Sequence, residues 1–326
     1  MAFDPSALDL YRDPQVFERE RRSIFAKTWQ FFTLASDFAR AGDYVSDTLA
    51  GFSLVVVRDA QGVLHGFHNV CPHRAGPLVG EGKGRCDREL VCKVHDWRFG
   101  FDGRLNTAPG FEGVAGFDPG AQHLFPIQVG VWRGFVFVNL DLAAAPLGDL
   151  LKPLEDRLPA PIERPARLQH AHPVDCNWKI YVENYLDGSG VMEEAGPNYV
   201  ELARTLTIEG EVVLHQSDDG RRAGAQWAWV WPNLAFSLYR GVLLIEHMKP
   251  MSAEVTEVKH IFLHEPEDVG VDAAVVASEE VTEDNAWICE RIQQNLAAGV
   301  FTSSAGRAPY ERAVTWFRER VVRSLG

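Results

Sequence analysis

Two pairs of cysteine and histidine constrain this chain more than any other feature of its sequence. One residue separates Cys71 from His73, two residues separate Cys92 from His95, and eighteen residues lie between the pairs. Thiolate and imidazole groups are common protein ligands for transition metals. Two Cys and two His on two short loops therefore predict a four-ligand metal site.

The distribution of these ligands distinguishes two kinds of site. Zinc would accept two Cys and two His, but a zinc finger places both Cys in one loop and both His on a helix. Here each loop offers one Cys and one His. That pattern matches a Rieske [2Fe–2S] cluster, in which both Cys bind one iron and both His bind the other. Cys86 lies between the loops and outside the pattern, and we interpret it as a buried apolar residue or a chance thiol.

Composition narrows the class of protein. The formal net charge of −13 argues against binding to nucleic acid or to an anionic membrane, because both require a basic surface. We see no apolar run of membrane-spanning length and no signal peptide. Five Cys, an odd and sparse set, do not suggest a disulfide framework. We therefore expect a cytoplasmic protein.

The chain divides into a β-rich first half and an α+β second half. Residues 14–30 have apolar side chains at helical spacing with Glu and Arg on the other face, and residues 40–141 contain short β-branched and aromatic runs broken by turns. A proline-rich segment follows. The second half is expected to contain helices at 177–186, 282–299 and 309–325 and strands at 211–216, 225–250 and 254–265.

The sequence resembles the alpha subunits of Rieske non-heme iron oxygenases, the aromatic ring-hydroxylating dioxygenase and demethylase family. The resemblance covers nearly the whole chain. It includes YRDPQVFERERRSIFAKTWQFF, GFHNVCPHR, LVCKVHDWRFGFDGRL, GFVFVNLD, NWKIYVENYL and ICERIQ, in the family's order. One departure is Asp96, where the family usually has Gly.

The resemblance implies an α+β fold in which an all-β Rieske [2Fe–2S] domain is inserted into a helix-grip-like catalytic-type domain. The expected parts are an N-terminal helical segment (1–37) that packs with the C-terminal domain, a Rieske domain (38–150) and a catalytic-type domain (151–326). The resemblance also implies a trimer-based assembly and a ferredoxin or flavin reductase as electron donor. The cluster ligands would be Cys71, His73, Cys92 and His95.

Family members also hold a mononuclear iron through two His and one carboxylate. When ENYLDG (183–188) is aligned with the family motif, Gly190 and Ala195 occupy the two histidine positions, and shifting by one residue does not help. Alignment of ICERIQ places Asn285 at the carboxylate position, with Asp284 just before it. We therefore expect mononuclear iron to be absent from this chain.

Other side chains are candidate replacement ligands for this second metal site. Glu193 and Glu194 are close in sequence, but paired carboxylates without imidazoles favour Mg or Ca over iron. His260 and His264 are four residues apart on a predicted strand, about 13 Å, too far to bind one metal. Asp187 is at about the position where the family has a carboxylate that contacts a cluster-ligating His across a subunit boundary. It could equally be a helix-end residue.

Three functions follow as expectations. In the first, the chain is the [2Fe–2S] subunit of a multicomponent oxygenase. It would relay electrons to the iron of a neighbouring catalytic paralogue, serve as a structural subunit, and itself lack O2-activating residues. In the second, it is a self-sufficient oxygenase with an atypical metal site, acting on an aromatic or amine substrate. In the third, it is a stand-alone electron-transfer or redox-sensing protein. The sequence names neither the substrate nor the reductase.

Overall fold

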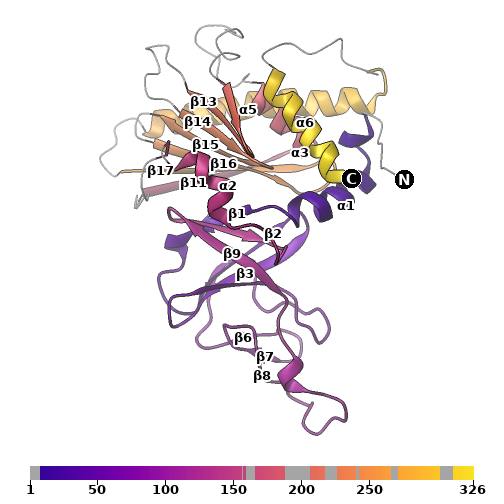
Figure 1. The fold of residues 1–326 in the computed structure, drawn as a ribbon, viewed down its shortest axis with the longest axis vertical. Helices are drawn as coiled ribbons and strands as arrows, with labels where there is room; N and C mark the ends of the chain where they lie inside the picture. The colour runs from indigo at the N-terminus through magenta and orange to yellow at the C-terminus, as the bar shows by residue number, and fades with distance from the viewer. Residues whose placement is uncertain are drawn as a thin grey trace. The chain divides into compact units, whose positions relative to one another are not determined.

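The computed structural model describes residues 8–155, 157–158, 166–187, 206–216, 226–239, 242–265, 271–301 and 311–326. The chain forms two compact units: Ala26–Leu147, and Met1–Phe25 together with Gly148–Gly326. Figure 1 draws the elements of both units. Among the described helices, none is both long and apolar enough to span a membrane.

The unit Ala26–Leu147 is built from strands. Its main sheet has seven strands in the order β1-β10-β9-β4-β3-β2-β5, and a smaller sheet has the order β6-β7-β8. The strands are β1 (Gln30–Leu34), β2 (Asp43–Leu49), β3 (Phe52–Arg58), β4 (Leu64–His68), β5 (Gly82–Arg85), β6 (Leu90–Val91), β7 (Arg98–Phe99), β8 (Leu105–Thr107), β9 (Pro126–Trp132) and β10 (Phe135–Asn139).

The first boundary of this unit differs from the expected one. The sequence predicts a helical segment over residues 1–37, but the β-rich unit begins at Ala26 because β1 pairs antiparallel with β10. The helix expected over 14–30 is also shorter, since α1 (Pro14–Glu20) and the π-helical turn η2 (Arg21–Phe25) end before β1. All five residues of β1 are buried, so this apolar run contributes to a sheet core rather than to a helix face.

The second unit combines a sheet with helices. Its seven strands have the order β11-β17-β16-β15-β14-β13-β12 and pair antiparallel throughout. They are β11 (Ala166–Val174), β12 (Leu206–Glu209), β13 (Val212–Gln216), β14 (Gln226–Val230), β15 (Leu234–Tyr239), β16 (Val242–Pro250) and β17 (Thr256–His264). The main described helices are α3 (Trp178–Leu186), α5 (Val271–Ala297) and α6 (Arg312–Leu325), and a short α2 (Leu147–Leu151) leads into this unit.

One face of this sheet carries the three helices (Figure 1). Trp229, Glu246 and His260 lie on one line across neighbouring strands and therefore point to the same face. Trp229 packs against Trp316 and Phe317 of α6, and Glu279 of α5 contacts His170, which lies opposite His260. The fold thus brings α3, α5 and α6 over the same polar and aromatic line of side chains.

A buried ion pair joins the N-terminal segment to α3. Nζ of Lys179 lies 2.5 Å from Glu20, and Nε1 of Trp178 donates a 2.9 Å hydrogen bond to the other oxygen of Glu20. Glu20 is fully buried and Lys179 is 2% exposed. Asn177 caps the start of α3 by accepting a hydrogen bond from the Lys179 N–H. These contacts hold α3 in place, and the ENYLDG segment begins in the last turn of this helix.

Candidate functional site

The two Cys-and-His loops have the same backbone construction. Cys71 follows β4, and its carbonyl accepts a hydrogen bond from the N–H of Ala75 four residues later. Cys92 follows β6, and its carbonyl accepts from the N–H of Asp96, again four residues later. Each loop therefore curls around its own cysteine, and the N–H of Lys93 on the second loop donates to Pro77 of the first.

The shared construction explains the departure at Asp96. Ala75 and Asp96 close their respective turns with φ of +57° and +55°, in the left-handed region. Glycine is the usual residue there, and Asp is among the few others that tolerate this region. Asp96 therefore replaces Gly without a change of turn.

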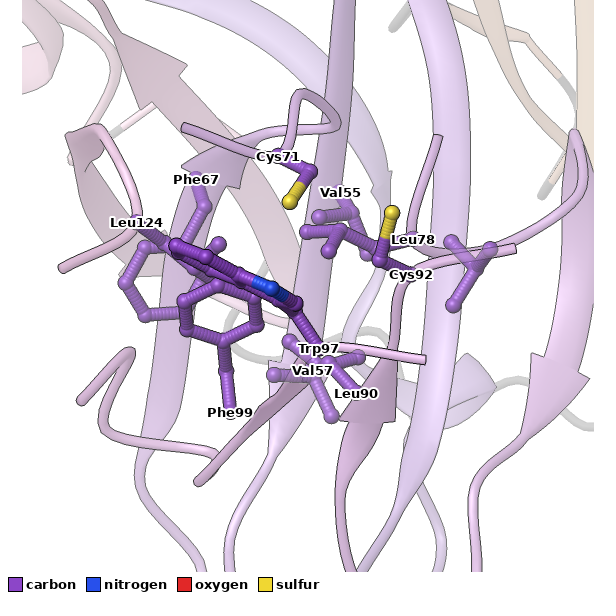
Figure 2. Close-up of a cluster of buried hydrophobic side chains, with 11 residues drawn as sticks. Val55, Val57, Phe67, Cys71, Leu78, Leu90, Cys92, Trp97, Phe99 and Leu124 are labelled. Carbon is purple, nitrogen blue, oxygen red and sulfur yellow. The ribbon is translucent and has the colours of Figure 1, made fainter. Parts of the chain in front are cut away.

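The four predicted ligands come together in the structure. Cys71 and Cys92 are 1% and 2% exposed and share one core cluster, and Figure 2 shows their sulfur atoms projecting into the same space. The rings of His73 and His95 are 4.6 Å apart between centroids. Nδ1 of His73 is buried and has no hydrogen-bond partner. An imidazole nitrogen turned away from every donor and acceptor is available as a metal ligand.

Burial shifts the protonation of two of the predicted ligands. Burial, reinforced by the neighbouring Cys92, raises the pKa of the Cys71 thiol to about 11. Burial and the neighbouring His95 lower the pKa of His73, which favours the neutral, metal-binding imidazole. Without a metal the thiol would stay protonated at neutral pH, and metal binding would hold it as thiolate. Two sulfur and two nitrogen donors on two adjoining loops fit a [2Fe–2S] group.

Aromatic rings enclose one side of this site. The indole of Trp97 stacks on His73 with centroids 4.7 Å apart and planes 6° from parallel, and Phe111 meets the same imidazole edge-on at 5.1 Å. Phe117 packs on Trp97 at 5.5 Å. Cys86 is half-buried and lies against the same core without joining the ligand set.

The predicted positions of a second metal site lie partly outside the described residues. These are Gly190, Glu193, Glu194 and Ala195. The described part of ENYLDG ends at Asp187, the C-cap of α3, whose N–H donates to the carbonyl of Glu183.

The carboxylate position on α5 is described. Asn285 is 8% exposed and its side-chain oxygen accepts a 2.8 Å hydrogen bond from Nδ2 of Asn184 on α3. Asp284 is exposed, so it points away from the side of α5 that meets α3. Of the two candidates, Asn285 is the residue that faces the α3 side, and its side chain is a neutral amide.

A polar group on the sheet was missed by sequence reasoning. His260 is 3% exposed, its Nε2 lies 3.6 Å from the carboxylate of Glu246, and the ring of His172 is 6.0 Å from its ring. Nε2 of His172 is buried without a hydrogen-bond partner. The pairing register of the strands brings these residues together, and no local sequence pattern predicts this arrangement. His264, by contrast, lies at the end of β17 and contacts the Glu265 carbonyl.

Neither unit shows a preformed site for a single metal ion among the described residues. Across the described part of the chain, no three side chains of His, Cys, Asp or Glu converge closely enough to hold one ion. A [2Fe–2S] group requires no such trio, because each of its irons takes two protein ligands. The paired loops therefore remain the best-formed metal site among these residues.

Two known family models match separate parts of the chain. The model of the Rieske [2Fe-2S] domain matches residues 28–118, and that of the ring hydroxylating alpha subunit catalytic domain matches residues 195–326. The carnitine monooxygenase oxygenase subunit of Escherichia coli strain K12 is 30% identical over 266 residues, covering 76% of this chain and 71% of that protein. Chloroplastic choline monooxygenase of Beta vulgaris is 28% identical over 332 residues, covering 94% and 74%.

Solved structures share the fold along almost the entire chain. The quaternary ammonium Rieske monooxygenase CntA aligns with a TM-score of 0.81 at 23% identity, covering 99% of this chain and 95% of that one. Naphthalene 1,2-dioxygenase from Rhodococcus sp. aligns with a TM-score of 0.75 at 19% identity, covering 98% and 93%.

Proposed function

We propose a function for this chain from one premise: it belongs to the family of Rieske oxygenase alpha subunits. The proposed role is that of a [2Fe–2S] subunit in a multicomponent oxygenase. The chain would relay electrons to the mononuclear iron of a neighbouring catalytic paralogue and would serve as a structural subunit of a trimer-based hetero-oligomer. A ferredoxin or flavin reductase would supply the electrons.

The observation that carries this proposal is the buried amide pair of Asn184 and Asn285. At Asn285, which alignment of ICERIQ assigns to the family's carboxylate ligand, α5 presents a neutral side chain that is already hydrogen-bonded to α3. A neutral amide is a far weaker ligand for Fe(II) than a carboxylate. The sequence adds that no His occurs between His172 and His215, the stretch in which the family has both imidazole ligands.

The paired loops supply the electron-transfer chemistry. Cys71 and Cys92 would bind one iron as thiolates, and His73 and His95 would bind the other, so the bound group would accept and pass on one electron at a time. His95 is exposed whereas His73 is enclosed by aromatic rings. Asp187 at the end of α3 is the candidate contact between this chain and a neighbour's cluster-ligating His. Free, mostly buried cysteines fit a reducing compartment such as the cytoplasm.

Two measurements test this role. Purified protein should contain about two irons and two acid-labile sulfides per chain, as expected for one [2Fe–2S] group. Co-expression with a paralogue that keeps both iron-ligating His should give a stable complex, and NAD(P)H oxidation coupled to product should require both chains. A third iron per chain in anaerobically purified protein, or product formation by this chain with a reductase alone, would overturn the proposal.

The polar group on the sheet favours a second candidate. His172, His260 and Glu246 place two imidazoles and one carboxylate on the helix-covered face, the donor types of a mononuclear iron site. In this reading the chain is a self-sufficient oxygenase with an atypical metal site, and metal binding must draw these side chains closer. The relatives named for carnitine and choline oxidation make an amine a reasonable substrate class. A third iron lost in His260→Ala but not in His264→Ala would establish it.

A stand-alone electron-transfer role is the third candidate. It predicts the same two irons and two sulfides but no partner. Failure to recover any complex from co-expression, together with reversible one-electron reduction of the isolated chain, would favour it over the relay.

A further inference from the structure

Trp97 links the two ligand loops through its side chain. It belongs to the second loop, two residues after His95, yet its ring stacks on His73 of the first loop at 4.7 Å. The ring is 2% exposed and packs in the same core cluster as Cys71 and Cys92. Figure 2 shows the indole beside the space into which both sulfur atoms project.

The polar edge of this indole has no partner. Nε1 of Trp97 is buried and, among the described residues, no protein group accepts a hydrogen bond from it. A buried indole N–H normally finds an acceptor, and leaving one unpaired is destabilising. A second unpaired buried atom, Nδ1 of His73, lies on the ring stacked against it. Two orphaned atoms on stacked rings beside two thiols point to one common occupant.

We propose that Trp97 is a positioning residue for the [2Fe–2S] group: its ring face holds the imidazole of His73, and its Nε1–H donates a hydrogen bond to an inorganic sulfide of the bound cluster. Hydrogen bonds to sulfur favour the reduced, more negative state and raise the reduction potential. This inference rests on the cluster assignment and not on electron relay to a paralogue.

The test compares two Trp→Phe variants of the full-length chain. Trp97→Phe keeps an aromatic face for His73 and removes the N–H. Trp29→Phe is the matched control, because Nε1 of Trp29 donates to the Ala145 carbonyl at 2.8 Å within the same unit. Both variants should retain the wild-type content of iron and sulfide. Redox titration should give a more negative midpoint for Trp97→Phe and an unchanged one for Trp29→Phe. Equal midpoints for the two variants and the wild type would overturn the proposal.

A measurement on the unsubstituted chain decides the matter if Trp97→Phe does not retain iron. Protein labelled with indole-15N tryptophan is reduced and studied by pulsed EPR. Trp97 is the one tryptophan in the core cluster around the two cysteines, so a 15N coupling to the reduced cluster is expected from it. Absence of any 15N coupling would refute the hydrogen bond. Iron and sulfide analysis tests the cluster assignment separately.

Discussion

Nδ2 of Asn184 donates a hydrogen bond of 2.8 Å to the side-chain oxygen of Asn285, joining α3 to α5 inside the second unit. Both residues are buried, at 7% and 8% exposure. A carboxylate at either position would need a cation or several donors to be stable there. The contact therefore stabilises the helix pair as it is and presents no charge to a metal.

Removal of this contact should lower stability measurably. Asn285→Ala removes a buried hydrogen bond between α3 and α5, a loss of about 1 kcal/mol in the free energy of unfolding. Urea denaturation followed by circular dichroism measures it. Asp284→Ala is the control, because Asp284 is exposed and should change stability by less than about 0.5 kcal/mol. Equal effects of the two substitutions would show that the amide pair is not a stabilising contact.

Breaking the buried ion pair should lower the free energy of unfolding more than breaking the amide pair. Lys179→Met leaves the Glu20 carboxylate uncompensated in the interior, which costs about 3–5 kcal/mol. The double variant Glu20→Gln/Lys179→Met should recover much of that loss, because no unpaired charge remains. A double-mutant cycle by urea denaturation gives the coupling free energy. Additive losses would mean that the two side chains do not stabilise each other.

Local sequence patterns predicted some of this architecture and missed the parts set by tertiary contacts. Spacing alone paired Cys71 with His73 and Cys92 with His95, because only one or two residues separate the members of each pair. The amphipathic pattern of residues 14–30 placed Glu20 on the polar face, whereas Glu20 is buried against Lys179. Charge at helical spacing cannot reveal a partner 159 residues away.

In the sheet of the second unit, too, contacts between distant residues could not be predicted from local sequence patterns. His172, His260 and Glu246 come from three strands, and only the strand register brings them together. Trp97 was part of a recognised motif, yet its stacking on His73 depends on how two loops meet. Asp96 is the opposite case, since its left-handed backbone explains why the family usually has Gly there.

Stability should fall as the pH is lowered below neutrality, in part through His247. Burial, with Lys249 and Lys259 nearby, holds the pKa of His247 well below its ordinary value. Below about pH 6.5 the unfolded chain binds a proton at this residue and the folded chain does not, so protonation favours unfolding. The contribution approaches about 1.4 kcal/mol per pH unit until the pH reaches the folded-state pKa.

Urea unfolding at several pH values between 5 and 7.5 tests this sign. His247→Gln should flatten the dependence, because it removes the titrating group while keeping a side chain that can accept from Asn233. A slope that is identical in His247→Gln and wild type would contradict the assignment.

Replacement of Cys71 by Ser should remove the iron and sulfide, whereas replacement of Cys86 by Ser should not. Cys71→Ser removes a thiolate ligand and should reduce iron and sulfide from about two each per chain to near zero. Cys86→Ser should keep the wild-type content, because Cys86 lies outside the ligand set although it packs against the same core. Metal analysis and the visible absorption spectrum report both outcomes. Loss of iron in Cys86→Ser alone would require a different ligand assignment.

Gly76 should be irreplaceable for a steric reason. A Cβ at this position would lie 2.5 Å from Cγ2 of Val94 and 3.1 Å from Sγ of Cys92. Val94 is 55% exposed and can move aside, but Sγ of Cys92 cannot move without leaving the position of a ligand. Gly76→Ala should therefore weaken cluster retention, seen as faster loss of visible absorbance under a chelator. Gly80→Ala is the matched control, because nothing lies within 4 Å of its added Cβ. If the two variants lose absorbance at the same rate, the close approach of Gly76 to Cys92 does not constrain the site.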